Sequence, residues 1–181
     1  MNLLRIKDTE SRIKEAGFTL TEMMVVVGLF VIMMAVGIPM FLSNLPNYRL
    51  RQAARQIAQD MNLAKMRAIS TNQKHGIYFN PSGGGAVQNT QDNRYTLFRD
   101  DGGTQNQLDA GDYRVKDDWP LPDTITIQAA NFVNDTVIFT PRSAAIGGTL
   151  ANNRGTVVVG NQKGDTKTVE VLANTARVKI Q

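Results

Sequence analysis

Residues 23–42 are the feature that most constrains how this chain folds, because none of these twenty residues is Asp, Glu, Lys, Arg or His. A helix rises about 1.5 Å per residue, so twenty residues span the roughly 30 Å hydrocarbon core of a bilayer. The segment therefore predicts a helix that crosses a membrane. The rest of the sequence is polar enough to give a mean hydropathy of -0.23, which implies a second, water-exposed part of the chain.

Composition excludes several functional classes. The 181 residues contain no cysteine, so disulfides and thiolate metal sites are excluded, and a net charge of +4 is too small by itself to indicate a nucleic-acid-binding protein. His75 is the only histidine, which argues against Ser-His and Cys-His enzymes. We therefore predict no enzymatic activity. Because His75 lies between Lys74 and Gly76 at a helix-to-strand junction, we expect it in a solvated loop.

The order of the N-terminal segments differs from that of a secretory signal. Such a signal places its apolar core before the cleavage site. Here a hydrophilic, net-basic segment, residues 1–17, ends in Gly17, and the apolar run follows it. We therefore expect the apolar segment to remain in the mature protein.

This arrangement resembles the class III leader of type IV prepilins and pseudopilins, since Gly17 is followed by the sequence FTLTE at residues 18–22 and then by the apolar run. The resemblance implies that a membrane peptidase, the prepilin peptidase, cuts after Gly17 and methylates the new N-terminus at Phe18. It assigns assembly roles to Glu22, the fifth residue of the mature chain, and to Pro39, which interrupts the apolar run.

Glu22 also needs a physical explanation. A lone carboxylate in a membrane helix costs about 2.5–3.5 kcal/mol near the bilayer centre and less near the interface. In the family this carboxylate pairs with the N-terminal ammonium of a neighbouring subunit, which implies that Glu22 sets the register of assembly. The alternative is that Glu22 only extends to the lipid headgroups.

Pro39 and the residues after it predict irregular helix. Proline removes a backbone donor, so Pro39, with Gly37 nearby, is expected to kink or loosen the helix or to mark the end of the membrane span. Residues 43–47, which include Pro46, predict a second bend or a short break.

Residues 48–71 predict an amphipathic continuation of this helix. Apolar residues recur at intervals of three or four at Leu50, Ala54, Ile57, Met61, Ala64 and Ala68. Arg51 and Arg55 lie on the opposite side. We expect one long, interrupted helix over residues 19–71, whose second half packs on a sheet.

Short β-favouring runs separated by turn residues follow the helix. They lie at residues 76–79, 94–98, 124–128, 136–139, 155–159, 168–172 and 176–180, with loops at 80–93, 100–112 and 144–153. A helix followed by many short strands predicts an α+β fold with a long N-terminal helix on a C-terminal antiparallel sheet. In the last run, Ala176, Val178 and Ile180 are expected to face the core while Arg177 and Lys179 face outward.

Two later segments extend the resemblance to the minor pseudopilin H and minor pilin T/U family. They are residues 57–73, which lead into the first strand, and the ending, where Phe139-Thr140-Pro141-Arg142 precedes a glycine-bearing loop and the run at 175–180. The family carries glycine where this chain has Ala176, which removes the residue best suited to a tight turn. The resemblance implies a leader at residues 1–17, a transmembrane and filament-core helix at 18–47, and a globular domain at 48–181.

Two polar segments offer alternative sites. The loop at residues 100–112 holds Asp100, Asp101, Asp109 and Asp112, which are ligands of the type that Ca²⁺ prefers, although the EF-hand spacing is absent. Asp and Gly also dominate turns, so a plain hairpin connection is the alternative to a Ca²⁺ site. We expect no other cofactor.

Basic residues follow the membrane segment at Arg49, Arg51, Arg55, Lys65, Arg67 and Lys74, and Arg177 with Lys179 forms an outward pair near the C-terminus. Some family members of the T type bind DNA through such a C-terminal region, which implies a DNA contact at Arg177 and Lys179. The alternative is that these groups meet lipid headgroups or acidic neighbouring subunits.

These observations predict a minor structural subunit of a type IV pilus or a type II secretion pseudopilus, acting in an initiation or tip complex. Its partners are other pilin or pseudopilin subunits and the prepilin peptidase. The resemblance implies a single-pass protein of the bacterial inner membrane with a periplasmic globular domain, which later joins the filament. A DNA-binding pilin for natural transformation and a signal-anchored periplasmic enzyme are the rival hypotheses.

Overall fold

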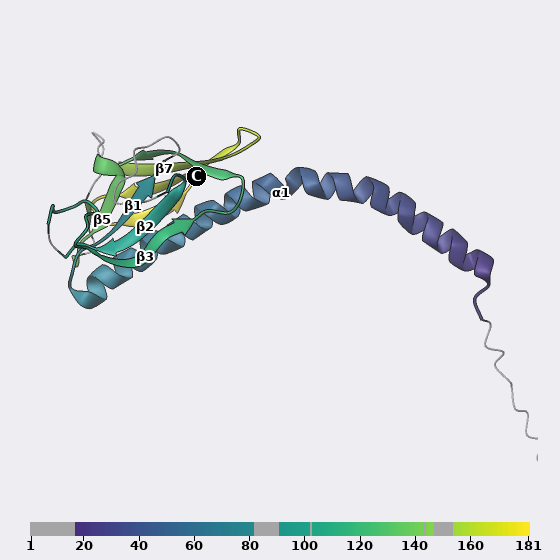
Figure 1. Cartoon of the computed structure of the whole chain (residues 1–181), viewed down its shortest axis with the longest axis horizontal. Helices are drawn as coiled ribbons and strands as arrows, with labels where there is room; N and C mark the ends of the chain where they lie inside the picture. Colours follow the sequence, from purple (N-terminus) through teal and green to yellow (C-terminus); the bar gives the residue numbers. More distant parts are fainter. Residues whose placement is uncertain (1–16, 82–90, 102, 143, 147–153) are drawn as a thin grey trace, which may run out of the picture. The chain divides into compact units, whose positions relative to one another are not determined.

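The computed structural model describes residues 17–81, 91–101, 103–142, 144–146 and 154–181. The chain forms two compact units, Met1–Leu42 and Ser43–Gln181. One helix, α1 (Leu20–Thr71), contributes its first part to the first unit and its second part to the second (Figure 1). Most of the predicted loop at residues 80–93, and residues 147–153 of the predicted loop at 144–153, lie outside the described residues.

The helix α1 is continuous, so the short break considered for residues 43–47 is not present. Pro39 and Pro46 both lie inside it, and each leaves a carbonyl one turn earlier without its usual backbone donor. Near Pro46, the ammonium of Lys163 donates to the carbonyl of Ser43. A donor from a loop of the globular unit thus supports the helix where proline weakens its backbone hydrogen bonding.

The second half of α1 buries the apolar face that the sequence predicts. All six predicted residues are buried, and the buried face also contains Ala53, Ala58 and Asp60. Alanine dominates this face, which allows the helix backbone to lie close to the strands beneath it.

The globular unit contains two antiparallel sheets (Figure 1). The five-stranded sheet has the order β3-β2-β1-β5-β6, with β1 (His75–Asn80), β2 (Arg94–Arg99), β3 (Tyr113–Pro120), β5 (Thr136–Phe139) and β6 (Ala145–Ile146). The four-stranded sheet has the order β4-β7-β8-β9, with β4 (Ile125–Asn131), β7 (Arg154–Asn161), β8 (Thr166–Leu172) and β9 (Arg177–Ile180). A 3-10 turn (Val133–Asp135) links β4 to β5. The fold is therefore α+β, as predicted.

Both sheets and the helix share one core cluster. At its centre the Phe79 ring stacks on Phe132 at 5.9 Å between centroids and lies 6.0 Å from Tyr95. A second, smaller cluster of Tyr78, Phe98, Leu108 and Ile138 covers the opposite face of the five-stranded sheet. Leu108 comes from the loop at residues 100–112, which we call the acidic loop. This loop helps to cover β1, which is buried along its whole length.

The seven predicted strands are present, but β3 and β6 were not predicted. Strand β3 shows two register shifts against β2, and Asp118 within it has a φ of 45°. These irregularities break the alternation of apolar and polar residues on which strand prediction depends. Strand β6 has only two residues and is too short to give a pattern.

The final strand differs from its prediction at both ends. Ala176 is fully buried but belongs to the turn before β9, where its φ is 46°. The backbone at this position therefore takes the left-handed conformation that favours glycine, and the chain forms the tight turn with alanine. At the other end, Ile180 is 39% exposed rather than buried. Arg177 and Lys179 face outward as predicted.

Candidate functional site

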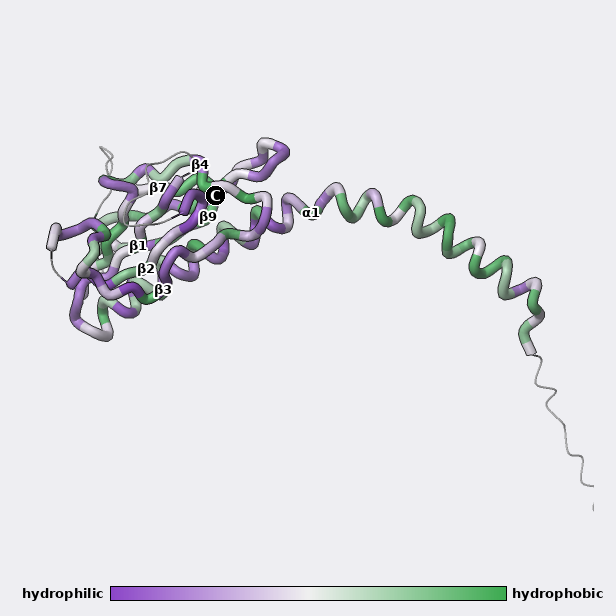
Figure 2. Tube along the Cα trace, viewed as in Figure 1, coloured by the Kyte–Doolittle hydropathy of each residue, from purple (hydrophilic) through white to green (hydrophobic). Residues whose placement is uncertain are grey.

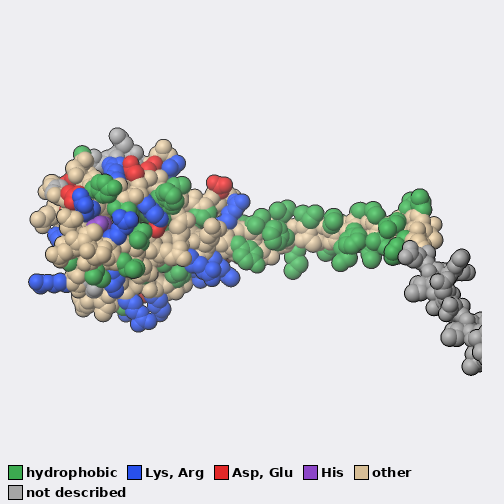
Figure 3. Space-filling model, turned by 90° about the horizontal axis from the view of Figure 1, so that it is seen from below, with side chains coloured by type: hydrophobic (Ala, Val, Ile, Leu, Met, Phe, Trp, Pro, Cys, Tyr) green, Lys and Arg blue, Asp and Glu red, His purple; other side chains and the backbone are tan. Residues whose placement is uncertain are grey.

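The apolar first half of α1 is exposed: residues 17–42, the described part of its unit, include nothing that covers it. Every large apolar side chain from Met23 to Leu42 is between 46% and 71% exposed. The helix also meets the length and hydropathy expected of a membrane span, although a signal sequence would meet them too. Figure 2 shows hydrophobic residues along this segment, and Figure 3 shows their side chains around the helix. A surface of this kind requires lipid or other protein helices around it.

A hydrogen-bonded cap begins the helix. The hydroxyl of Thr19 accepts a hydrogen bond from the backbone N–H of Glu22 at 3.2 Å, and the Glu22 carboxylate accepts one from the backbone N–H of Thr19 at 2.9 Å. The Thr19 hydroxyl also donates to this carboxylate at 3.0 Å. This reciprocal pair is a capping box. The sequence T-x-x-E carried the signal for it, which we did not use in predicting the role of Glu22.

The other predicted processing and assembly residues are accessible. Apart from its chain neighbours, no described residue comes within 4 Å of the position that a Cβ would take on Gly17, and Phe18 next to it is 79% exposed. Pro39 lies on the exposed apolar part of α1. This placement is compatible with the cleavage, methylation and assembly roles proposed for these residues.

A buried polar network, missed by the sequence analysis, joins α1 to the five-stranded sheet. The Asp60 carboxylate accepts hydrogen bonds from the Lys116 ammonium and from the Tyr95 hydroxyl, both at 2.5 Å. Gln56 donates to the Tyr95 oxygen at 2.9 Å and to the carbonyl of Pro120 at 3.2 Å. Burial, together with the nearby Asp60 carboxylate, raises the pKa of Tyr95 far above its usual value, so the phenol remains a donor. An acidic residue on an otherwise apolar helix face was the only available sequence signal.

His75 is buried, so its predicted position in a solvated loop is wrong. It is the first residue of β1, and its ring Nδ1 lies 3.2 Å from the carbonyl oxygen of Gln73, which assigns the ring proton of the neutral form to Nδ1. Burial lowers the pKa of His75, and the positive charges of Arg67 and Arg99 add to this effect, while the hydrogen bond to Gln73 opposes it.

The lowered pKa predicts that the globular unit loses stability in mild acid. The unfolded chain binds a proton at His75 near pH 6.5, whereas the folded chain binds it only at lower pH. Protonation of His75 therefore does not reduce the stability of the folded chain above about pH 6.5, and reduces it progressively as the pH falls below that value. We expect the thermal midpoint of the detergent-solubilised chain to fall between pH 7.5 and pH 5.5, and to fall less in His75→Gln. An equal fall in both proteins would contradict this assignment.

In the acidic loop the carboxylates bind the loop's own backbone. Asp109 accepts hydrogen bonds from the N–H groups of Thr104 and Gly111, at 2.7 and 3.1 Å. Asp112 accepts hydrogen bonds from the N–H groups of Asp101 and Asp109, at 3.0 and 2.9 Å.

The other two acidic residues also have partners. Asp100 accepts a hydrogen bond from the N–H of Asn106, and the Asp101 carboxylate lies 2.6 Å from Arg99. Within the part of the chain that the structure describes, no cluster of three metal-ligating side chains occurs. The hydrogen bonds favour the hairpin connection over the Ca²⁺ site.

The C-terminal basic pair lies beside a neutralised site. Arg177, Lys179 and Arg154 line a hollow of about 210 Å³ around Glu170. The Glu170 carboxylate is buried, lies 3.1 Å from Arg154 and accepts a hydrogen bond from the Gln181 side chain at 2.8 Å. The positive charge of the exposed pair is therefore next to a charge-balanced ion pair, and a DNA contact at Arg177 and Lys179 remains a prediction.

Comparison with solved structures finds distant similarity. The type IV minor pilin FimU of Pseudomonas aeruginosa has 14% sequence identity and a TM-score of 0.48, with 75% of this chain and 90% of that chain covered. The minor pseudopilin EpsH of the Vibrio cholerae type 2 secretion system has 11% identity and a TM-score of 0.48, with 74% and 96% covered. A search of the curated proteins finds no match.

Two family profiles match the sequence. The profile described as a prokaryotic N-terminal methylation motif matches residues 12–38, the stretch that contains Gly17, Phe18 and Glu22. The profile described as type II transport protein GspH matches residues 53–175, which include the second half of α1 and most of both sheets. With more than half of its length matched, the chain belongs to the GspH family.

Proposed function

We propose that this chain is cleaved after Gly17 by the prepilin peptidase, methylated at Phe18, and held in the bacterial inner membrane with its globular unit in the periplasm until it assembles. As a member of the GspH family it is a minor structural subunit of a type IV pilus or a type II secretion pseudopilus. This is a family of structural subunits rather than of enzymes. Within the filament, we place the chain in the initiation or tip complex.

The exposed apolar half of α1 is the observation that supports this proposal most strongly. Its side chains are covered by lipid before assembly, and other helices replace the lipid in the filament. Gly28, Ala35 and Gly37 offer small surfaces where a second helix can approach closely. Among the described residues, none would obstruct such an approach by lying within 4 Å of a Cβ placed on Gly28 or Gly37.

The processing step gives a direct test of the proposal. We expect mass spectrometry of the membrane-extracted protein to show an N-terminus at Phe18 that carries one methyl group, because the leader motif spans this position. The matched control is the same chain expressed in cells that lack the peptidase, where the leader should remain. An N-terminus at Met1 in cells that contain the peptidase would refute the processing assignment.

A further inference from the structure

Eight of the ten arginines of the globular unit fall into two groups, and the other two are Arg142 and Arg177, which lines the hollow around Glu170. Four arginines on strands, Arg94, Arg99, Arg114 and Arg154, each lie within 3.4 Å of a carboxylate. The four arginines of α1, by contrast, form no recorded ion pair with any residue that the structure describes: Arg49, Arg51, Arg55 and Arg67. Four of the five strand arginines thus have a carboxylate partner within the globular unit, while the arginines of the helix leave positive charge at the surface.

No carboxylate of the helix itself can balance this charge. Asp60 is the one acidic residue between residues 48 and 71, and it is buried and bound to Lys116. Arg51 and Arg55 are four residues apart, so they are neighbours on the helix surface, and like charges at this spacing destabilise a helix. Figure 3 shows Lys and Arg side chains in several places on the visible face of the unit and few Asp or Glu side chains. A partner carboxylate would relieve this repulsion.

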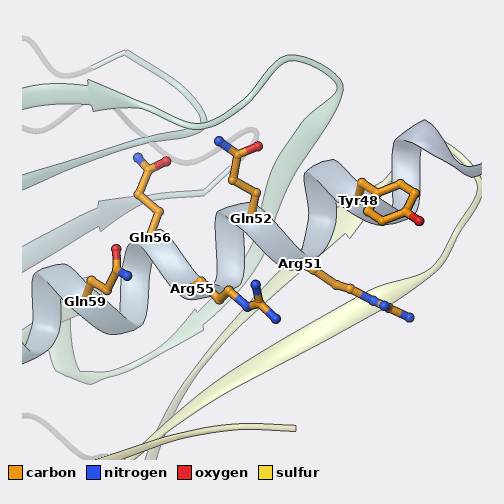
Figure 4. A pocket seen from close by; sticks show the side chains of 6 residues that line it. All are labelled: Tyr48, Arg51, Gln52, Arg55, Gln56 and Gln59. Carbon is orange, nitrogen blue, oxygen red and sulfur yellow. The ribbon is translucent and has the colours of Figure 1, made fainter. Parts of the chain in front are cut away.

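The side chains around these arginines identify the kind of partner. Arg51 and Arg55 border an open hollow of about 430 Å³ with Tyr48, Gln52, Gln56 and Gln59 (Figure 4). The two arginines extend to the same side of the helix in this view. Guanidinium groups only donate hydrogen bonds, whereas carboxamides both donate and accept. The combination suits a segment that offers carboxylates and peptide groups, while a phosphodiester offers acceptors only.

One wall of this hollow, formed by Gln56, is held in place by hydrogen bonds. Gln56 is held by the Tyr95 hydroxyl and by the carbonyl of Pro120, and Tyr95 is held in turn by Asp60. The polar network that joins the helix to the sheet therefore positions one wall of the hollow before any partner arrives, which reduces the entropy lost on binding.

We propose that the outward face of α1 over residues 48–59 binds an acidic segment of a different pilin-class subunit. The proposal rests on the proposed function, since it names the partner surface of an assembling subunit. A second copy of this chain offers fewer carboxylates, because Asp101, Asp117, Asp118 and Glu170 are paired with arginines, and Asp109 and Asp112 bind the backbone of their own loop. A lipid headgroup fits poorly as well, because its phosphodiester offers acceptors only and supplies no donor for the carboxamide oxygens of Gln52, Gln56 and Gln59.

Photo-crosslinking in cells that assemble the filament tests this proposal with the full chain. A benzophenone amino acid replaces Gln52, and a second strain carries it at Val31 in the apolar half as a report on assembly. We expect the Gln52 probe to form an adduct with another pilin-class subunit, on a peptide that contains Asp or Glu. The double change Arg51→Glu with Arg55→Glu should reduce this adduct about tenfold, since two surface attractions become repulsions.

Two controls separate local from general charge effects. Arg51→Lys with Arg55→Lys should keep most of the adduct, and Arg177→Glu with Lys179→Glu, which changes net charge equally, should leave it unchanged. The docking surface is refuted, and the assembly role stands, if the Val31 probe captures pilin subunits while the Gln52 probe captures only lipid, DNA or nothing. It is also refuted if the yield of the Gln52 adduct is unchanged by Arg51→Glu with Arg55→Glu. If neither probe captures a pilin subunit, both proposals fail.

Discussion

Replacing Glu22 by Gln should abolish incorporation of the chain into filaments as completely as replacing it by Ala. The capping box needs only an acceptor at this position, and Gln supplies one, so Glu22→Gln keeps the helix start while it removes the charge. If the carboxylate pairs with the N-terminal ammonium of a neighbour, then the charge is what assembly requires. The measurement is the amount of the chain in sheared and purified filaments relative to its amount in membranes.

Thr19→Val is the matched control, because it removes the hydroxyl of the same cap and leaves the charge of Glu22 in place. Loss of a cap costs about 1 kcal/mol, which a helix held by lipid or by neighbouring helices tolerates. Incorporation should therefore be close to that of the unchanged protein. Normal incorporation of Glu22→Gln would show that Glu22 acts as a capping residue and not in registration.

The largest loss of stability is expected from Lys116→Met. This change leaves the Asp60 carboxylate buried with only the Tyr95 hydroxyl as its recorded donor. Breaking a buried ion pair from one side costs about 3–5 kcal/mol, and the partial exposure of Lys116 places this case at the lower end. A loss of about 3 kcal/mol lowers the thermal midpoint of a unit of this size by about 10 °C. Circular dichroism of the detergent-solubilised chain measures it.

Two further variants make that result specific. Arg114→Met breaks an ion pair that is also short, at 2.6 Å, but its carboxylate partner Asp117 is 54% exposed and is solvated when the pair is lost, so the change should cost less than about 1 kcal/mol. The combination Lys116→Met with Asp60→Asn should recover much of the stability, because the buried charge is gone and the asparagine can still bind Tyr95. A midpoint for Lys116→Met close to that of Arg114→Met would mean that the buried pair does not hold the helix to the sheet.

The parts of the fold that follow from periodic patterns were predictable from sequence. The buried face of α1 repeats every three or four residues, and most strands are short apolar runs between turn residues. Strand β3 escaped prediction because its sequence is rich in charged residues and two register shifts disturb its alternation. One of those charged residues, Lys116, forms the ion pair with Asp60 of α1. Long-range polar pairing of this kind leaves no local pattern.

Single-residue environments were harder to predict than elements. The neighbours of His75 in the sequence predict a loop, yet His75 is buried and begins β1. The acidic loop packs on this strand through Leu108, a tertiary contact that the local sequence does not predict. Ala176 was expected in the final strand, but it takes a left-handed turn conformation, with a φ of 46°, that alanine seldom adopts. The processing and assembly residues were predicted from the leader pattern alone, and their roles stay predictions, because a local motif leaves no trace in the packing of the fold.

The alanine-rich buried face of α1 has a mechanical consequence. Small side chains bring the helix backbone close to the strands, and closely packed interiors transmit strain with little compression. A pull along the helix axis would therefore load the packed contacts and the Asp60 ion pair at the same time, as a shear across the whole face. Failure would require all of them to slip together, whereas a pull on the C-terminal end of β9 would open its bonds to β8 one after another. Tension that enters through the helix thus meets the most resistant direction of the globular unit.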